Sequence, residues 1–299
     1  MSNTKLNVKD SSTLLVFLQE KMGGMSRTSL KQMLSQRRVM VDGHVETNFA
    51  CPLDAGSVVE IVHGRPSYEL KHPKLRVVYE DEHLIVVEKR EGLLTVATYP
   101  GSTETTVFSI LKNYVRQSNP RGGVFTVHRL DRETSGLLVF AKSKELQEYM
   151  REWWRDIVKC RTYIAVAEGL FDKKEGRIVT WLTEDKRNAV VYSSPTDDGG
   201  KKSITNYKVV KEKAGERDTD IGLSLVELNL ETGRTNQIRV HLASIGHPIA
   251  GDRKYGSGTQ LPIDRLALHA RVLEFIHPVT EKVMHFETPI PKEFIRLMK

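Results

Sequence analysis

A short polar loop that runs directly into an apolar strand most constrains how this chain can fold. Residues 127–135 carry histidine, arginine, aspartate and threonine, and the apolar residues 137–140 follow at once. A rigid sheet usually presents reactive side chains in this way, on a loop at its rim. Asp131 lies between Arg129 and Arg132, whose positive charge favours the ionised carboxylate. We therefore expect Asp131 to act as a nucleophile or a base and the arginines to hold phosphate.

Length and composition indicate a two-domain protein. A chain of 299 residues suits a large domain with a smaller one attached. Its composition is ordinary for a globular protein, and no apolar run reaches the roughly 18 residues that a membrane helix needs. The N-terminus lacks the apolar core of a secretory signal, and Cys51 and Cys160 can form at most one bridge. We therefore expect a cytoplasmic protein, and the net charge of +7 favours a polyanionic partner.

Residues 1–63 are expected to form a small α+β domain with a basic face. The pattern predicts helices over 14–22 and 26–38, followed by short strands around an Asp-Gly turn at 42–43. The apolar positions of the second helix share one side, and its basic residues lie on the other sides with no acid nearby. From charge alone, a solvated face without a ligand stays open as an alternative.

The same segment, residues 12–63, resembles the αL-type RNA-binding module named after small-subunit ribosomal protein four. The shared features are a Ser-Arg pair that opens a helix, a Val-x-Val-Asp-Gly hairpin and an Ala-Gly-Ser turn before the last strand. In that family the module docks on structured RNA through its basic helix. The resemblance therefore implies RNA contacts from the basic residues of the segment, which are Arg27, Lys31, Arg37 and Arg38.

Residues 64–75 are predicted to be a linker, because prolines, a glycine and basic residues occur there without periodicity. A larger domain is then expected over residues 76–299. Its pattern predicts a β-hairpin over 77–89, a helix over 106–115 and strands over 136–141 and 161–169.

The second half of this domain combines strands with a helix that begins among basic residues. Residues 184–203 are polar and rich in turns, which is typical of a long hairpin or a mobile insertion. Residues 223–230 alternate as a half-buried strand does, and a helix with Thr235 as its N-cap is predicted to follow. Helix N-termini attract anions, and here Arg234 and Arg239 add side-chain donors.

Taken together, these motifs resemble those of the RluA-type RNA pseudouridine synthases. The likeness covers about residues 75–299 and keeps the motifs in order, which makes it far more specific than any single one. The motifs include Glu80–Lys89, His128–Asp131 with Thr134–Gly136, Thr162–Val166, Thr232–Leu242, Gly246–Asp252 and Leu266–Ala270. An RNA-binding module in front of the catalytic domain is also an arrangement common in that family.

The resemblance implies that this chain isomerises uridine to pseudouridine in RNA and consumes no cofactor. Matched by motif position, Asp131 would be the catalytic aspartate. Tyr163 would stack on the flipped uracil and help handle a proton, and Arg239 would pair with Asp131. Arg129 would fill the gap that the uridine leaves in the RNA stack, because removing a base from its stack is costly.

Three positions depart from the family pattern. Arg90 stands where a proline commonly follows the lysine at the end of the second strand, which is expected to loosen that turn. Asn236 replaces a histidine in the Thr-Gly-Arg-Thr-His motif, and Ala250 replaces the commoner valine. None of these is the nucleophile, so we expect changed RNA positioning and packing rather than loss of activity.

Two other classes of function compete with this interpretation. A non-catalytic RNA-binding or ribosome-assembly protein would need a broken active site, yet Asp131, Tyr163 and Arg239 are all present. A metal-dependent nuclease would need clustered ligands, whereas the histidines show no His-x-x-x-His pairing.

The sequence thus predicts an α+β protein whose catalytic domain contains a largely antiparallel, mixed sheet. The expected partner is structured RNA, with large-subunit rRNA preferred and tRNA as the alternative substrate. We expect the chain to act as a monomer, with neither a metal nor a membrane as a partner.

Overall fold

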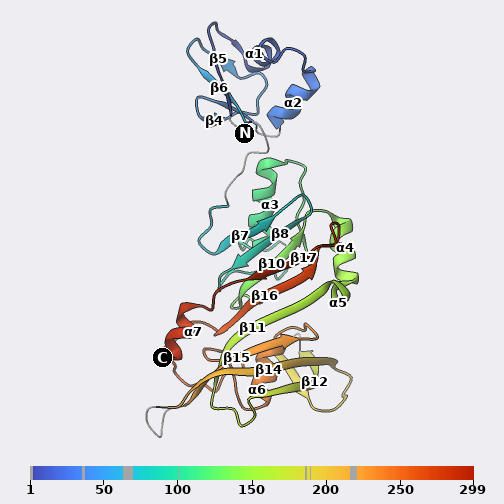
Figure 1. The fold of residues 1–299 in the computed structure, drawn as a ribbon, viewed down its shortest axis with the longest axis vertical. Helices are drawn as coiled ribbons and strands as arrows, with labels where there is room; N and C mark the ends of the chain where they lie inside the picture. The colour runs from blue at the N-terminus through green and yellow to red at the C-terminus, as the bar shows by residue number, and fades with distance from the viewer. Residues whose placement is uncertain are drawn as a thin grey trace. The chain divides into compact units, whose positions relative to one another are not determined.

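The computed structural model describes residues 3–35, 38–62, 70–99, 101–185, 187–188, 190–215 and 221–299. Its elements are drawn in Figure 1. The chain divides into two compact units, residues 1–71 with 108–124, and residues 72–107 with 125–299. The predicted division into residues 1–63, a linker and residues 76–299 stays a prediction, since residues 64–69 lie outside the described residues.

The first unit contains a small antiparallel sheet and two short helices. The sheet has the order β1-β6-β3-β4, and a separate pair joins β2 to β5. The strands are β1 (Thr4–Asn7), β2 (Ser12–Thr13), β3 (Val39–Val41), β4 (His44–Val45), β5 (Pro52–Leu53) and β6 (Val58–Ile61). The helices near them in sequence are α1 (Leu14–Lys21) and α2 (Arg27–Ser35), and α3 (Val107–Ser118) comes later in the chain.

Apolar residues of α1 and α2 pack on the small sheet. Leu30, Met33 and Leu34 of α2 are buried together with Leu18 of α1, as the apolar periodicity predicts. The predicted extension of this second helix to residue 38 is wrong, because Arg38 lies beyond the helix and donates through Nε to the Val62 carbonyl at 3.1 Å.

The second unit is built on one large sheet of the order β13-β12-β14-β15-β11-β16-β10-β8-β7, with β17 paired to β16 and β9 to β10. Among the described residues all its strand pairs are antiparallel except β10 with β16, which confirms the predicted mixed and largely antiparallel sheet. The strands of its first half are β7 (Leu75–Glu80), β8 (Leu84–Lys89), β9 (Phe125–Thr126), β10 (Ser135–Ala141) and β11 (Val158–Glu168). Those of its second half are β12 (Glu175–Asp185), β13 (Val190–Ser194), β14 (Lys201–Lys213), β15 (Leu223–Leu230), β16 (Leu268–Ile276) and β17 (Val283–Glu287).

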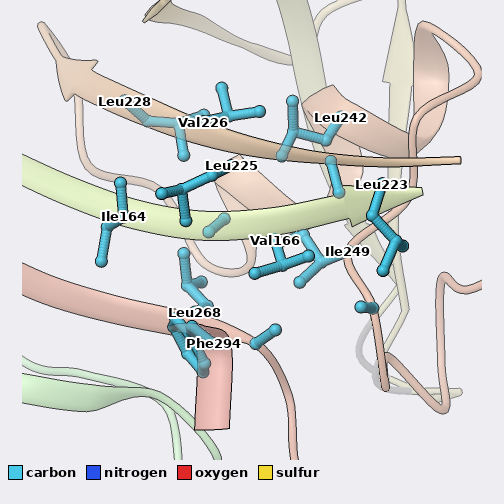
Figure 2. Packing of buried hydrophobic residues seen from close by; sticks show 14 of the residues in the cluster. Ile164, Val166, Leu223, Leu225, Val226, Leu228, Leu242, Ile249, Leu268 and Phe294 are labelled. Atoms are coloured by element: carbon cyan, nitrogen blue, oxygen red, sulfur yellow. The ribbon is translucent and has the colours of Figure 1, made fainter. Parts of the chain in front are cut away.

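Four helices belong to this unit among the described residues. They are α4 (Lys144–Glu152), α5 (Trp154–Ile157), α6 (Gln237–Ser244) and α7 (Lys292–Leu297). Of these, α6 and α7 contribute apolar side chains to its core. Figure 2 shows Leu242 of α6 and Phe294 of α7 among apolar residues of the central strands, such as Val166 of β11 and Val226 of β15. Leu242 and Phe294 are fully buried, so each helix is fixed to the sheet by its apolar side.

The sequence prediction of a hairpin over 77–89 is confirmed by the antiparallel pairing of β7 with β8. Asp81 stabilises the turn, because its Oδ1 accepts from the backbone N–H groups of His83 and Leu84 at 2.8 and 2.7 Å. The polar segment 184–203 contains the end of β12, the strand β13 and the start of β14. β12 pairs with both of the others and is therefore the middle strand of the three.

The parallel junction between β10 and β16 depends on Gly136. This residue has φ +119°, and a Cβ there would lie 2.1 Å from the carbonyl oxygen of Ala270, its partner on β16. Both the backbone conformation and the close approach therefore require glycine at the point where the polar loop enters β10.

We expect Gly136→Ala to destabilise the protein by more than about 3 kcal/mol, because backbone must shift as well as adopt a strained φ. Gly199→Ala is the matched control, since Gly199 also has a positive φ, of +86°, but a Cβ there would meet no atom within 4 Å. Urea unfolding of both variants measures the difference. Equal losses of stability in the two variants would contradict the packing argument.

Candidate active site

A cavity of about 840 Å³ opens beside the polar loop of the second unit. Its walls come from residues 126–134, α4 and α5, the strand β11, and the segment from the end of β15 to the start of α6. All five residues predicted as catalytic or RNA-binding in this unit line the cavity, namely Arg129, Asp131, Tyr163, Arg234 and Arg239. Segments distant in the sequence thus meet at one site.

The backbone on both sides of Asp131 is held by side chains of other segments. The Thr95 hydroxyl donates to the Leu130 carbonyl at 2.7 Å and accepts from the Leu130 N–H at 3.1 Å. The Lys89 ammonium donates to the Arg132 carbonyl at 2.9 Å. Asp131 therefore lies between two fixed peptide groups, which limits the movement of its carboxylate.

Lys89 is fully buried at the end of β8 and also donates to the Arg90 carbonyl at 3.1 Å. Burial lowers the pKa of Lys89 to about 7, while the negative charges of Glu133 and Asp131 oppose that change. The sequence analysis treated residues 89–92 only as a departure from a Lys-Pro turn and missed this lysine. The sequence signal for this contact was a lysine at the end of an apolar strand, because a lysine is almost never fully buried unless it has polar partners.

The far end of the loop is held by a buried chain of polar side chains. Arg265 binds Glu91 at 2.5 Å and donates to the Ser135 hydroxyl at 2.6 Å. Ser135 shares a 2.7 Å hydrogen bond with Nδ1 of His269, whose Nε2 lies 2.8 Å from the Thr288 hydroxyl. Burial lowers the pKa of His269 to about 3, so its ring is neutral and its two nitrogens can take opposite hydrogen-bonding roles.

The pKa of Asp131 is shifted in the direction opposite to the one that its flanking arginines favour. Burial raises the pKa of the Asp131 carboxyl above its ordinary value, and the charges of Arg239, Arg129 and Lys89 only partly oppose that rise. The neighbouring Arg132 contributes little, because its guanidinium binds Glu104 at 2.5 Å. The charges of Arg239 and Arg129 thus favour the ionised carboxylate, as predicted for nearby arginines, but desolvation outweighs them and the net shift of the pKa is upward.

Arg239 is fixed by a carboxylate other than the expected one. Its Nε and Nη2 donate to the two carboxylate oxygens of Asp252, both at 2.7 Å, and its Nη1 donates to the Asn236 side chain at 3.0 Å. The expected pairing with Asp131 is therefore not formed in the structure, where Asp252 and Asn236 bind the guanidinium. Arg239 nevertheless lowers the pKa of Asp131 through its charge, so it influences the carboxylate without a paired contact.

Asn236, which stands where the family commonly has a histidine, fits the conformation and the contacts of the loop before α6. Asn236 is in the left-handed region at φ 53° and is the N-cap of α6, so the prediction of Thr235 as the N-cap is wrong. Its side chain accepts from Arg239 and donates to the Tyr255 hydroxyl at 3.2 Å. Asparagine tolerates this conformation and has the donor and the acceptor that the two contacts need.

Tyr163 lies on β11, opposite Leu228 of β15 and Ala270 of β16. Burial raises the pKa of its phenol, the charge of Arg161 opposes the rise and that of Asp131 adds to it. The hydroxyl therefore stays protonated at neutral pH and can donate a hydrogen bond into the cavity.

Comparison with known proteins agrees with this geometry. A family model described as RNA pseudouridylate synthase matches residues 83–244. The chain belongs to this family. It is an RNA pseudouridine synthase, and so an isomerase that acts on RNA.

Individual relatives of the synthase cover most of its length. An uncharacterized RNA pseudouridine synthase of Bacillus subtilis is 38% identical over 77% of this chain and 73% of its own. Ribosomal large subunit pseudouridine synthase D of Nitrosomonas europaea is 34% identical over 92% of this chain and 80% of its own. The solved structure of human RNA pseudouridylate synthase domain containing 1 covers 76% of this chain and 86% of its own, with 25% identity and a TM-score of 0.57.

The basic residues predicted to bind RNA in the first unit of the synthase are only partly described. Arg27 and Lys31 are exposed on α2, and the Lys31 ammonium lies 4.3 Å from the centre of the Phe49 ring. Arg38 is half-buried, and Arg37 lies outside the described residues. Within the described ranges, no helix is long and apolar enough to cross a membrane, and no three His, Cys, Asp or Glu side chains gather as metal ligands do.

We expect the synthase to become more stable, relative to Lys89→Met, as the pH rises from 7 towards 10. The folded pKa of Lys89, about 7, is below its unfolded value, so the unfolded chain binds an extra proton in that range and loses this advantage as the pH rises. Guanidinium unfolding of both proteins at several pH values measures the difference in their free energies of unfolding. Groups that titrate alike in both proteins do not contribute to this difference. A difference that stays constant with pH would show that Lys89 does not titrate in this window.

Proposed function

We propose that this synthase converts specific uridines of large-subunit rRNA to pseudouridine, with Asp131 as the catalytic aspartate. The observation that carries the proposal is the position of Asp131, which lies on a braced loop in the wall of an arginine-lined cavity that also contains Tyr163. Pre-organised groups of this kind are what a reaction on an extruded base requires.

The isomerisation breaks the bond from N1 of uracil to C1′ of ribose and forms a bond from C5 to C1′. The proton on C5 leaves, N1 gains a proton, and no other atoms are exchanged. In this scheme Asp131 acts as nucleophile or base, which requires the ionised carboxylate. Burial raises the pKa of Asp131, and the positive charges around it favour the ionised form. Tyr163 stacks on the detached uracil, and its protonated hydroxyl can donate a hydrogen bond to a carbonyl oxygen of the base.

Two arginines complete the proposed site. Arg239 is held in place by Asp252, so its charge acts on Asp131 from a fixed position. Arg129 lines the cavity, where its side chain can occupy the gap left in the RNA stack. Arg234 lies at another wall and is proposed to contact a phosphate near the start of α6.

The choice of large-subunit rRNA rests on two observations. The relative from Nitrosomonas europaea carries that substrate in its name and covers almost the whole chain. The first unit presents Arg27 and Lys31 on the exposed side of α2, which is suited to phosphate contacts outside the catalytic unit. A tRNA substrate remains the second candidate, since the cavity itself would accept a uridine from either RNA.

We expect Asp131→Asn to abolish pseudouridine formation while RNA binding changes less than about threefold, because the amide keeps the shape and loses the charge. The measurement is a site-resolved pseudouridine map, by carbodiimide labelling and primer extension, of rRNA and tRNA from cells with and without the gene. Complementation by wild type and by Asp131→Asn then identifies the RNA, the uridine and the residue together.

A modification restored by Asp131→Asn would remove Asp131 from its proposed role. A site that disappears from tRNA and not from rRNA would keep the reaction and change the substrate. If every site persists in the deletion, purified protein on transcribed rRNA separates an overlapping activity from a protein that only binds RNA.

We expect the double variant Arg27→Glu, Lys31→Glu to bind rRNA more weakly and with a salt dependence whose slope is smaller by about 2, one for each lost phosphate contact. Its activity on a minimal stem-loop around the target uridine should change much less. The matched control reverses two exposed charges elsewhere, Lys282 and Lys292. Equal weakening by both pairs would indicate a general charge effect instead of a docking surface on α2.

A further inference from the structure

We propose that Arg161 is a phosphate-binding residue inside the cavity, which holds a phosphodiester of the bound RNA strand beside the target uridine. The inference rests on the proposed active site and adds a residue that the sequence analysis did not single out. It starts from an unbalanced charge, because Arg161 is a half-buried arginine in the cavity wall with no carboxylate of the described residues bound to it.

Arg161 and Tyr163 line the same cavity from neighbouring positions on one strand. Both residues lie on β11 and are two positions apart, so their side chains leave the same face of the strand about 7 Å from each other. Both line the cavity. A nucleotide whose base lies against Tyr163 therefore brings its own phosphate, or the neighbouring one, next to Arg161.

The guanidinium of Arg161 is held by neutral neighbours. Its Nη2 donates to the Leu230 carbonyl at 3.2 Å, and its Cζ lies 5.9 Å from the centre of the Trp154 ring. Gly233 leaves room for it, since a Cβ at that glycine would lie 2.8 Å from Nη1. These contacts orient the group and use one of the N–H donors of a guanidinium that lines the cavity, but they do not neutralise its charge.

Two other half-buried arginines of the second unit are paired. Arg239 binds Asp252 through two nitrogens, and Arg265 binds Glu91. In the part of the chain that the structure describes, no carboxylate lies within ion-pair distance of Arg161. Burial lowers the pKa of this guanidinium, and no carboxylate of the described residues opposes that change. Removing a charge from water without a counter-charge is unfavourable, so an anion that arrives with the ligand would complete the site.

The charged groups around the cavity support a phosphate as that anion. Besides Arg239, which is paired with Asp252, four further arginines line it and attract a polyanion, namely Arg129, Arg151, Arg155 and Arg234. Of the acids, Asp131 belongs to the proposed reaction, Glu152 is exposed, and Glu231 is already bound by Arg177 and Asn206. His128 beside Trp154 is neutral, since burial lowers its pKa to about 3, so it cannot replace Arg161 as a cation.

A guanidinium binds phosphate through two parallel N–H donors, whereas a uracil carbonyl would leave its charge uncompensated. Arg161 is therefore a positioning residue for the RNA backbone. Tyr163 remains the group proposed to stack on the uracil, and Asp131 remains the proposed catalytic aspartate.

The test uses full-length protein with Arg161→Gln, Arg161→Lys and, as a matched control, Arg76→Gln, which removes an exposed arginine paired with Glu88. Tritium release from rRNA labelled at C5 of uridine, isolated from cells that lack the gene, gives kcat and KM at several salt concentrations. We expect Arg161→Gln to raise KM about tenfold or more and to lower kcat less. The slope of log kcat/KM against log salt should fall by about 1, while Arg161→Lys retains the slope and Arg76→Gln matches wild type.

A lower kcat with unchanged KM and salt slope in Arg161→Gln would overturn the proposal, and so would a slope in Arg161→Lys as small as that of Arg161→Gln. A second measurement does not depend on turnover. Wild type and Asp131→Asn should bind uridine 5′-monophosphate at least about fivefold more tightly than uridine, by NMR titration, and Arg161→Gln should lose that preference. Inactive wild type with an intact nucleotide preference would instead contradict the proposed RNA substrate and leave the phosphate site standing, whereas absence of the preference in wild type would refute the site.

Discussion

The hydrogen bond from the buried Lys89 ammonium to the Arg132 carbonyl is the interaction on which the proposed active site most depends. It ties the end of β8 to the loop that carries Asp131, and it places a positive charge near that carboxylate. The ammonium is stabilised there by two carbonyl oxygens and by nearby acids, against a large cost of burial. The same contact thus fixes the geometry of the loop and influences its electrostatics.

Local sequence patterns were enough to predict the main elements but not the polar contacts between them. The hairpin of β7 and β8 and the half-buried strand β15 follow from alternation and turn residues, which act within a few positions. The partner of Arg239 does not, since Asp252 is 13 residues away and is brought into place by a turn that no periodicity describes. That Asp131 and Tyr163 line one cavity was predictable because their motifs are specific. The contacts of Lys89 and Arg161 depend on burial and could only come from the fold.

The arginines of the cavity illustrate how similar residues acquire different tasks. Arg239 is held by a carboxylate and acts on Asp131 only at a distance, while Arg129 lines the cavity and is proposed to follow the RNA. Arg161 differs from both, because neutral groups orient its guanidinium and no acid of the described residues compensates its charge. Since an ion pair lowers the affinity of an arginine for a further anion, the distribution of acids decides which arginines can bind phosphate.

The parallel contact of β10 with β16 also has a consequence for the order in which the chain matures. Ser135 and Gly136 pair with His269 and Ala270, more than 130 positions later in the chain. During synthesis the loop with Asp131 leaves the ribosome long before β16 exists, so Gly136 can pair with Lys89 of β8 while the contacts of Ser135 with Arg265 and His269 must wait for the C-terminal segment. Closing so long a loop is among the slow steps of folding. The loop that carries Asp131 therefore gains its last contacts only when nearly the whole chain is present, and a product truncated before β16 would keep the contacts of Lys89 and Thr95 but lack those of Ser135 with Arg265 and His269.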